Sequence, residues 1–266
     1  MTLSRRDVSE LLTAHGLAPR RAFGQNFVVD PNTVRRIARL AGVGEGDSVV
    51  EIGAGLGSLT LALLETGASV TAVEIDRGLV PVLRGVAPGA RVVEGDALRL
   101  DWGELLAGAP AWSLVANLPY NVATPLVVTL LEEVAPITRL LVMVQAEVGE
   151  RMAASVGDEQ YGAVSVLVAY WATSKVVGRV PPSVFLPKPK VDSALVAIER
   201  RASLPTTAPY PRLKELVRAG FGQRRKMLRR SLADVIEPAA FEAAGIRPDA
   251  RAEELDVEAW GRLAAW

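Results

Sequence analysis

Five short apolar runs, alternating with stretches of helical character, constrain the fold of this chain most. They cover residues 48–52, 69–75, 91–94, 113–116 and 140–144. Parallel strands need long crossover connections, usually helices, and they are apolar throughout because those helices cover both faces of the sheet. The pattern therefore predicts an α/β fold with a doubly wound parallel sheet, in which ligands bind outside the carboxyl ends of the strands.

The flanking segments predict a second, smaller domain. Asp30 and Pro31 suit the N-cap and first position of a helix that precedes the sheet. Residues 176–185 and 191–198 are rich in β-formers, and from about residue 200 the pattern is helical only. We expect one domain over residues 1–200, whose first 45 residues form a helical cap, and a helical domain over residues 201–266.

Two residue types exclude whole classes of chemistry. The chain has no cysteine and a single histidine, His15, which rules out thiolate chemistry and a His-rich metal site. We therefore expect no metal. The longest apolar run, residues 163–172, is half of what a membrane-spanning helix needs. These features predict a soluble, cytoplasmic protein with no membrane partner.

A net charge of zero hides a strong pattern along the chain. Residues 41–118 carry 4 basic and 10 acidic groups, whereas residues 1–40 carry 7 and 3, and residues 181–236 carry 12 and 4. An acidic centre between basic segments predicts a pocket for a cationic or neutral ligand beside anion-binding surfaces. Ordinary solvated charge remains the alternative reading of the basic segments.

The junction after the first apolar run carries the sequence Glu-Ile-Gly-Ala-Gly-Leu-Gly, residues 51–57. Such glycines let a backbone approach a ligand closely, although glycines also simply make turns. Glu74 and Asp76 end the second run, where an acid can accept ribose hydroxyls, and Asp96 ends the third, where it can accept an adenine amine. The crowded carboxylates disfavour a pyrophosphate and suit the sulfonium of S-adenosylmethionine (SAM). A nicotinamide dehydrogenase is the alternative for this domain.

The fourth run ends in Asn117-Leu118-Pro119-Tyr120. This tetrapeptide offers an amide oxygen that can accept from an exocyclic amine, a backbone fixed by proline, and an aromatic face on which a base can stack. Beside a sulfonium donor, it predicts a clamp that positions an amine for methylation.

At this point the chain resembles the KsgA-type adenine-N6 dimethyltransferases, the family of ribosomal RNA small-subunit methyltransferase A. The matching segments lie in the same order along nearly the whole chain. They are residues 23–27, 51–57, 74–76, 95–97, 117–120, 160–162, 185–193 and 221–228.

The resemblance implies a Rossmann-like, SAM-dependent methyltransferase domain with a small C-terminal helical domain that binds RNA. It implies SAM contacts at Asn26, Val28, Gly53, Glu74, Asp96 and Asn117, with residues 25–27 closing over the methionine part. Glu51 either orients the glycine loop or touches the ligand. The catalytic set that it implies is Asn117, Leu118, Pro119, Tyr120 and Phe185, with Phe185 as a second aromatic wall for the base. The RNA contacts that we expect are Lys188, Lys190, Arg224, Arg225, Lys226 and Arg229.

The implied function is dimethylation of N6 of two adjacent adenosines in the 3′-terminal hairpin loop of 16S rRNA. The partner is an immature small ribosomal subunit, and the enzyme is expected to be a monomer. One alternative is the related methylase of large-subunit rRNA that confers macrolide resistance, which tends to carry Ile at the position of Leu118. A further alternative is a protein that acts mainly as a ribosome assembly factor.

Overall fold

The computed structural model describes residues 2–20, 23–223, 226–247 and 249–266. The chain forms two compact units. The first contains Met1–Gly149 and Val176–Glu199, and the second contains Glu150–Lys175 and Arg200–Trp266. The chain thus changes unit near residue 200, where the sequence analysis places its boundary. Residues 150–175 differ from that expectation, because they lie in the second unit.

Within the described residues, the main sheet has seven strands in the order β4-β3-β2-β5-β6-β9-β7. The strands are β2 (Ser48–Ile52), β3 (Ser69–Glu74), β4 (Arg91–Glu94), β5 (Trp112–Asn117), β6 (Ile137–Gln145), β7 (Ala172–Val180) and β9 (Ser193–Arg200). All five apolar runs form strands, so the α/β fold is confirmed.

Strand direction is where the sheet differs from the prediction. The strands β2 to β6 pair in parallel with one another, but β9 runs antiparallel to β6. The sheet is therefore mixed rather than purely parallel. In consequence the carboxyl ends of the parallel strands share one edge of the sheet with the start of β9.

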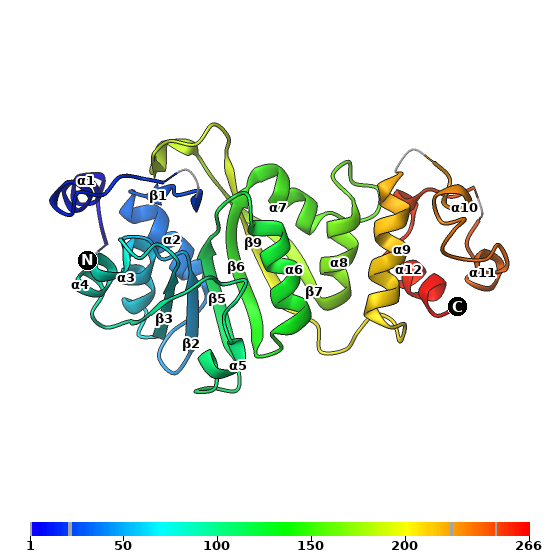
Figure 1. Ribbon diagram of the computed structural model, residues 1–266, viewed down its shortest axis with the longest axis horizontal. Coiled ribbons are helices and arrows are strands. Elements are labelled where there is room, and N and C mark those ends of the chain that lie inside the picture. Colours follow the sequence, from blue (N-terminus) through cyan, green and yellow to red (C-terminus); the bar gives the residue numbers. More distant parts are fainter. Residues whose placement is uncertain (1, 21–22, 224–225, 248) are drawn as a thin grey trace. The chain divides into compact units, whose positions relative to one another are not determined.

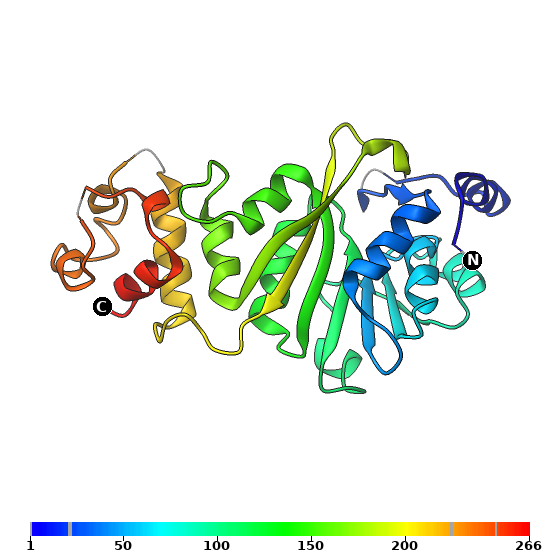
Figure 2. The same ribbon diagram turned by 180° about the vertical axis from the view of Figure 1, so that it is seen from behind.

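Helices cover both faces of this sheet. The helix α2 (Pro31–Ala41) lies over one face and α6 (Ala123–Glu133) over the other (Figures 1 and 2). As predicted, Asp30 caps α2 by accepting a hydrogen bond from the Thr33 N–H (2.9 Å), with Pro31 in the first turn. The other helices of the first unit are α1 (Arg5–Ala14), α3 (Ser58–Leu64), α4 (Val80–Val86), α5 (Trp102–Leu105) and the start of α7 (Ala146–Ala153).

The main core of the first unit lies between the sheet and the helices α2 and α3. It joins Ile37 of α2 and Leu63 of α3 to Val49, Val115 and Met143 from three neighbouring strands, all nearly inaccessible to solvent. Burial of such side chains contributes roughly 1.5–3 kcal/mol each. This packing fixes the strand ends, and with them the loops that follow.

A small second sheet joins the N-terminal segment to residues that follow β7. It pairs β1 (Phe27–Val28) with β8 (Phe185–Leu186) in antiparallel fashion, with Val28 opposite Phe185. A short 3₁₀ helix, Pro182–Val184, leads into β8. Through this pairing, Val28 and Phe185 pack in one hydrophobic cluster with Val115 and Met143 of the main sheet.

The second unit is helical outside its share of β7. Its elements are α8 (Ala163–Trp171), α9 (Tyr210–Gly222), α10 (Leu228–Ser231), α11 (Ala239–Ala243), a 3₁₀ turn (Ala252–Glu254) and α12 (Val257–Ala264). The rings of Tyr170 and Trp171 in α8 pack against Tyr210 of α9, with centroids about 5 Å apart. This aromatic contact explains why residues 150–175 belong with the C-terminal helices. Among the described residues, no helix is both long and apolar enough to cross a bilayer.

Candidate active site

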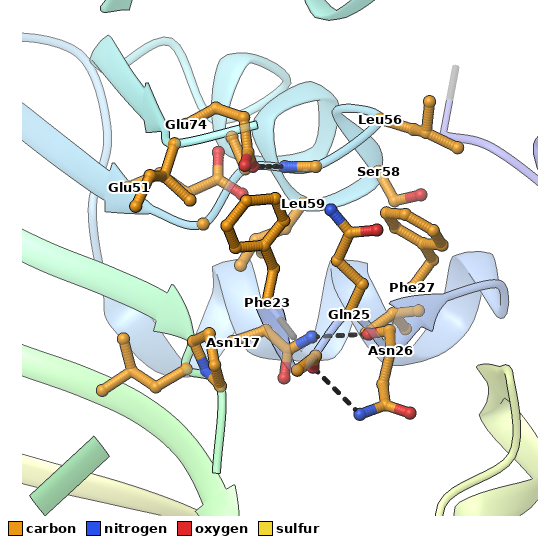
Figure 3. Close-up of a pocket in the computed structure, with 18 of the residues that line it drawn as sticks. Phe23, Gln25, Asn26, Phe27, Glu51, Leu56, Ser58, Leu59, Glu74 and Asn117 are labelled. Carbon is orange, nitrogen blue, oxygen red and sulfur yellow. Dashed lines mark hydrogen bonds between the residues drawn. The ribbon is translucent and has the colours of Figure 1, made fainter. Parts of the chain in front are cut away.

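The carboxyl ends of β2, β3 and β5 surround a cavity of about 80 Å³ (Figure 3). Because β2 pairs in parallel with both β3 and β5, the loops that follow these three strands meet at one edge of the sheet. Most of the residues proposed from the sequence line this cavity. They are Asn26, Val28, Glu51, Gly53, Glu74, Asn117, Leu118, Pro119 and Tyr120.

The glycine loop between β2 and α3 forms one wall of the cavity. Gly55 has a φ of 59°, in the left-handed region that glycine tolerates. A Cβ built at Gly55 would lie 3.1 Å from ring atoms of Phe27, so a side chain there would press on this ring. The loop backbone therefore reaches the cavity without an intervening side chain.

Glu74, at the end of β3, is 4% exposed and holds the glycine loop in place. One carboxylate oxygen accepts from the Gly55 N–H (2.7 Å) and the other from the Asp76 N–H (2.8 Å). Burial raises the pKa of Glu74, while these two hydrogen bonds oppose the shift. Each oxygen has a second lone pair for a ligand that enters the cavity.

Glu51 is a second buried carboxylate, 2% exposed, on the same wall. Its Oε2 accepts a hydrogen bond from the Thr60 hydroxyl at 2.6 Å. Burial raises the pKa of Glu51 to about 8, and the neighbouring Glu74 adds to the rise. A cation in the cavity would favour the ionised form of both groups, because opposite charges lower the pKa of an acid.

Asn117, at the end of β5, has a fixed amide orientation. Its Nδ2 donates to the backbone carbonyl of Asn26 at 2.9 Å (Figure 3). The amide nitrogen is thereby occupied by the N-terminal segment, which leaves the amide oxygen as an acceptor. Asn26 in turn donates from its own Nδ2 to the Gly24 carbonyl at 3.1 Å.

The segment before β1 is tied to the end of β3 by Asp76, which is 3% exposed. Its carboxylate accepts from Arg20 Nη1 (3.1 Å) and from Gln25 Nε2 (2.9 Å). Sequence reasoning placed Asp76 near a ribose but did not find these partners. Together with the bond from Asn117, they hold residues 23–26 against the cavity.

A second cavity, of about 210 Å³, adjoins the first and contains Asp96. Its lining includes Ile75 and Leu98, which are 42% and 45% exposed despite being large apolar side chains. The Phe23 ring lines both cavities. Sequence reasoning missed these apolar walls, because single exposed aliphatic residues carry no pattern.

Tyr120 lies in the turn after Pro119 and is half-buried. Its hydroxyl lies 2.9 Å from the Ser193 Oγ, and burial raises its pKa. The preceding Leu118 is only 1% exposed, and its N–H donates to the Met143 carbonyl (3.0 Å). The tetrapeptide is thus fixed to the sheet on one side and offers Asn117 and Tyr120 on the other.

Phe185 does not form the second aromatic wall that the sequence analysis expected. Its side chain is 0% exposed and belongs to the main core, with Val28 as its strand partner. A ring enclosed in this way has no free face for a base. The pairing of β8 with β1 explains the difference, because it turns Phe185 into the core.

The expected RNA contacts fall in both units. Lys188 and Lys190 are exposed in the loop between β8 and β9 of the first unit, and Lys226 and Arg229 are exposed in the second unit. Arg224 and Arg225 lie outside the described residues.

Comparison with known proteins identifies the family of this chain. A sequence model described as ribosomal RNA adenine dimethylase matches residues 16–266. Ribosomal RNA small subunit methyltransferase A of Kineococcus radiotolerans is 48% identical in an alignment of 275 positions, which covers 99% of this chain and 91% of the relative. Its counterpart in Leifsonia xyli is 49% identical, with coverage of 98% and 95%.

Two solved structures share the fold over most of the chain. A dimethyladenosine transferase from Plasmodium falciparum has a TM-score of 0.74 at 25% identity, and it covers 88% of this chain and 94% of its own. The 23S rRNA methyltransferase ErmE has a TM-score of 0.69 at 28% identity, with coverage of 90% and 98%.

Proposed function

This chain belongs to the ribosomal RNA adenine dimethylase family, and we propose that it uses SAM to dimethylate N6 of two adjacent adenosines of 16S rRNA. The target loop lies near the 3′ end of the RNA, in an immature small ribosomal subunit, and the enzyme acts as a monomer. The observation that carries the proposal is the fixed amide of Asn117 in the wall of the first cavity, which shares Gly53 and Pro119 with the cavity that contains Asp96.

The two cavities suit the two ends of SAM. Glu51 and Glu74 lie beside the first cavity, where a cation would favour their ionised forms and a pyrophosphate would disfavour them. Ile75 and Leu98 offer apolar surface in the second cavity, next to the carboxylate of Asp96, which supports an adenine ring whose amine is accepted by that carboxylate. When bound, SAM supplies a methyl group on a positively charged sulfur.

Asn117 and Leu118 act on the amine that receives the methyl group. The adenine N6 lone pair is delocalised into its ring, so the amine is a weak nucleophile. With its Nδ2 held by the Asn26 carbonyl, Asn117 presents Oδ1 as one acceptor for the amine, and the Leu118 carbonyl is the second. Two such hydrogen bonds favour a pyramidal nitrogen, and Tyr120 supplies a stacking face worth roughly 1–3 kcal/mol. Holding an amine in attack geometry can lower a barrier by roughly 7–11 kcal/mol.

The rRNA target follows from the relatives and from the exposed basic residues. Relatives that are 43–49% identical over nearly the whole chain carry the small-subunit name, while the 23S enzyme ErmE is 28% identical. The exposed side chains of Lys188, Lys190, Lys226 and Arg229 would neutralise RNA phosphates. An adenosine in a loop costs less free energy to rotate into the site than one in a duplex, because less base stacking is lost.

Methyl transfer to separated ribosomal subunits tests the proposal. Small and large subunits from cells that lack the enzyme would be incubated with protein and SAM, and the digested rRNA mapped by mass spectrometry. We expect four methyl groups on two adjacent adenosines of 16S rRNA and none on 23S rRNA. Methylation of 23S rRNA, or of neither RNA, would overturn it.

Two further measurements separate the alternatives. Calorimetry should show binding of SAM and not of NAD, whereas a dehydrogenase would show the reverse. An Asn117→Ala variant that fully restores ribosome assembly in cells would show that binding alone serves the assembly function.

A further inference from the structure

Ser193 joins the turn that carries Tyr120 to the first residue of β9. The Tyr120 hydroxyl and the Ser193 Oγ are 2.9 Å apart, across 73 residues of sequence. Ser193 is 0% exposed, whereas Tyr120 is half-buried. The bond therefore connects a ring at the cavity with a group in the interior.

The Ser193 end of this bond belongs to a firmly held part of the sheet. Ser193 pairs with Gln145 at the end of β6, and the Asp192 carbonyl beside it accepts from the Ala146 N–H at 3.0 Å. The next strand residue packs tightly, because a Cβ built at Gly149 would lie 2.9 Å from the Ala194 Cβ. Movement of the serine would disturb each of these contacts.

The Tyr120 end is held differently. Its backbone lies in a turn rather than in a strand, and its ring rotates about two side-chain bonds. A hydrogen bond at the hydroxyl restricts rotation about the Cα–Cβ bond, because that rotation moves the hydroxyl oxygen. Rotation about the Cβ–Cγ bond leaves the oxygen on its axis and is not held by this bond. The position of the ring and the direction of its long axis are thus set by β9 and not only by the turn.

The loop that ends at Ser193 carries Lys188 and Lys190, both exposed. Residues that can hold RNA phosphates therefore lead directly into the residue that holds the stacking ring. RNA bound to this loop and a base stacked on Tyr120 would therefore both be positioned by the start of β9.

We propose that Ser193 is a positioning residue for methyl transfer: it orients the Tyr120 ring so that the target adenine stacks in attack geometry. The inference rests on the proposed function, because it takes Tyr120 as the surface on which the base stacks. Ser193 has no contact with the cofactor in this scheme, so its effect should fall on turnover and not on SAM binding.

A double-mutant cycle tests this role. The proteins are the wild type, Ser193→Ala, Tyr120→Phe and the double variant, each assayed for methyl transfer to small subunits and for SAM affinity by calorimetry. Loss of one hydrogen bond should lower kcat roughly 3- to 10-fold in each single variant. The double variant should be no slower than the singles, because both substitutions remove the same bond. The Kd for SAM should change less than twofold.

Ser113→Ala is the matched control. Ser113 is also a buried serine (5% exposed), but it lies at the start of β5, far along the strand from Asn117. The Ser113→Ala variant should keep the wild-type kcat. Unchanged kcat in Ser193→Ala, additive losses in the double variant, or an equal loss of SAM affinity would each overturn the inference. If Ser193→Ala does not fold, Tyr120→Phe tests the same bond from its half-buried end, and full activity there overturns it. A wild type that methylates no rRNA overturns the proposed function instead.

Discussion

Replacing Glu51 by Gln should flatten the pH dependence of this protein's stability. Glu51 is 2% exposed, and its pKa is raised from 4.5 to about 8, mainly by burial. The folded state therefore binds this proton more tightly than the unfolded chain does. The stability that results is fully present below pH 4.5 and is lost as the pH rises through 8.

The size of the effect follows from the same shift. One pKa unit corresponds to roughly 1.4 kcal/mol, so the loss across this window is on the order of 4–5 kcal/mol. The Glu51→Gln side chain cannot ionise, and its amide oxygen can still accept from Thr60. The variant should therefore lose far less stability with rising pH. The pKa of Glu74 is also raised, so a smaller dependence of the same sign should remain.

Urea unfolding at a series of pH values from 5 to 8.5 measures this directly. The wild type should show midpoints that fall steeply with pH, and Glu51→Gln a shallower fall. Glu133→Gln, at an exposed acid at the end of α6, should follow the wild type. Parallel wild-type and Glu51→Gln profiles would refute the reasoning, because they would show that Glu51 does not ionise across this window.

Three other substitutions probe the cavity wall, the N-terminal segment and the RNA surface. Gly55→Ala forces a Cβ to 3.1 Å from the Phe27 ring at a positive φ, so thermal melts should show a loss of about 1–2 kcal/mol, with weaker SAM binding by calorimetry. Asp76→Asn weakens charge-assisted hydrogen bonds to residues 20, 25 and 78. The Kd for SAM should therefore rise several-fold in calorimetry, and an unchanged Kd would contradict the role of Asp76 in holding the N-terminal segment. Charge reversal at Lys188 and Lys190 together should lower rRNA affinity and its dependence on salt in filter binding, and an unchanged salt slope would remove this loop from the RNA surface.

The central strands and the cavity could be predicted because their signals are local. The apolar composition of a run such as residues 48–52 predicts that it forms a buried strand. The carboxyl ends of parallel strands lie at the same edge of a sheet, so the glycines and acids that follow these strands meet there. The antiparallel direction of β9 could not be predicted, since apolar composition does not encode the direction of a strand. The placement of residues 150–175 with the C-terminal helices depends on ring contacts of Tyr170 and Trp171, which link segments far apart in sequence.

The site was predicted unevenly for the same reason. Glu74 and Asn117 line one cavity, because each ends a strand that the sequence predicts. Asn26 lines the same cavity, but the short strand β1 that it precedes was not predicted. Phe185 was placed wrongly, since its burial depends on the pairing of β8 with β1. The Tyr120–Ser193 bond also joins distant segments, and neither residue alone indicates the other.

The most direct test of the amide clamp is methyl transfer by Asn117→Ala, assayed on immature small subunits with mass-spectrometric counting of methyl groups on 16S rRNA. Asn32→Ala, at an exposed asparagine of α2, is the matched control. If Asn117 positions the target amine, the Asn117→Ala protein should fold and add methyl groups at least 100-fold more slowly than the wild type, because misplacing the reacting amine costs about that much in rate. The control should remain fully active. Near-normal dimethylation by a folded Asn117→Ala variant would contradict it.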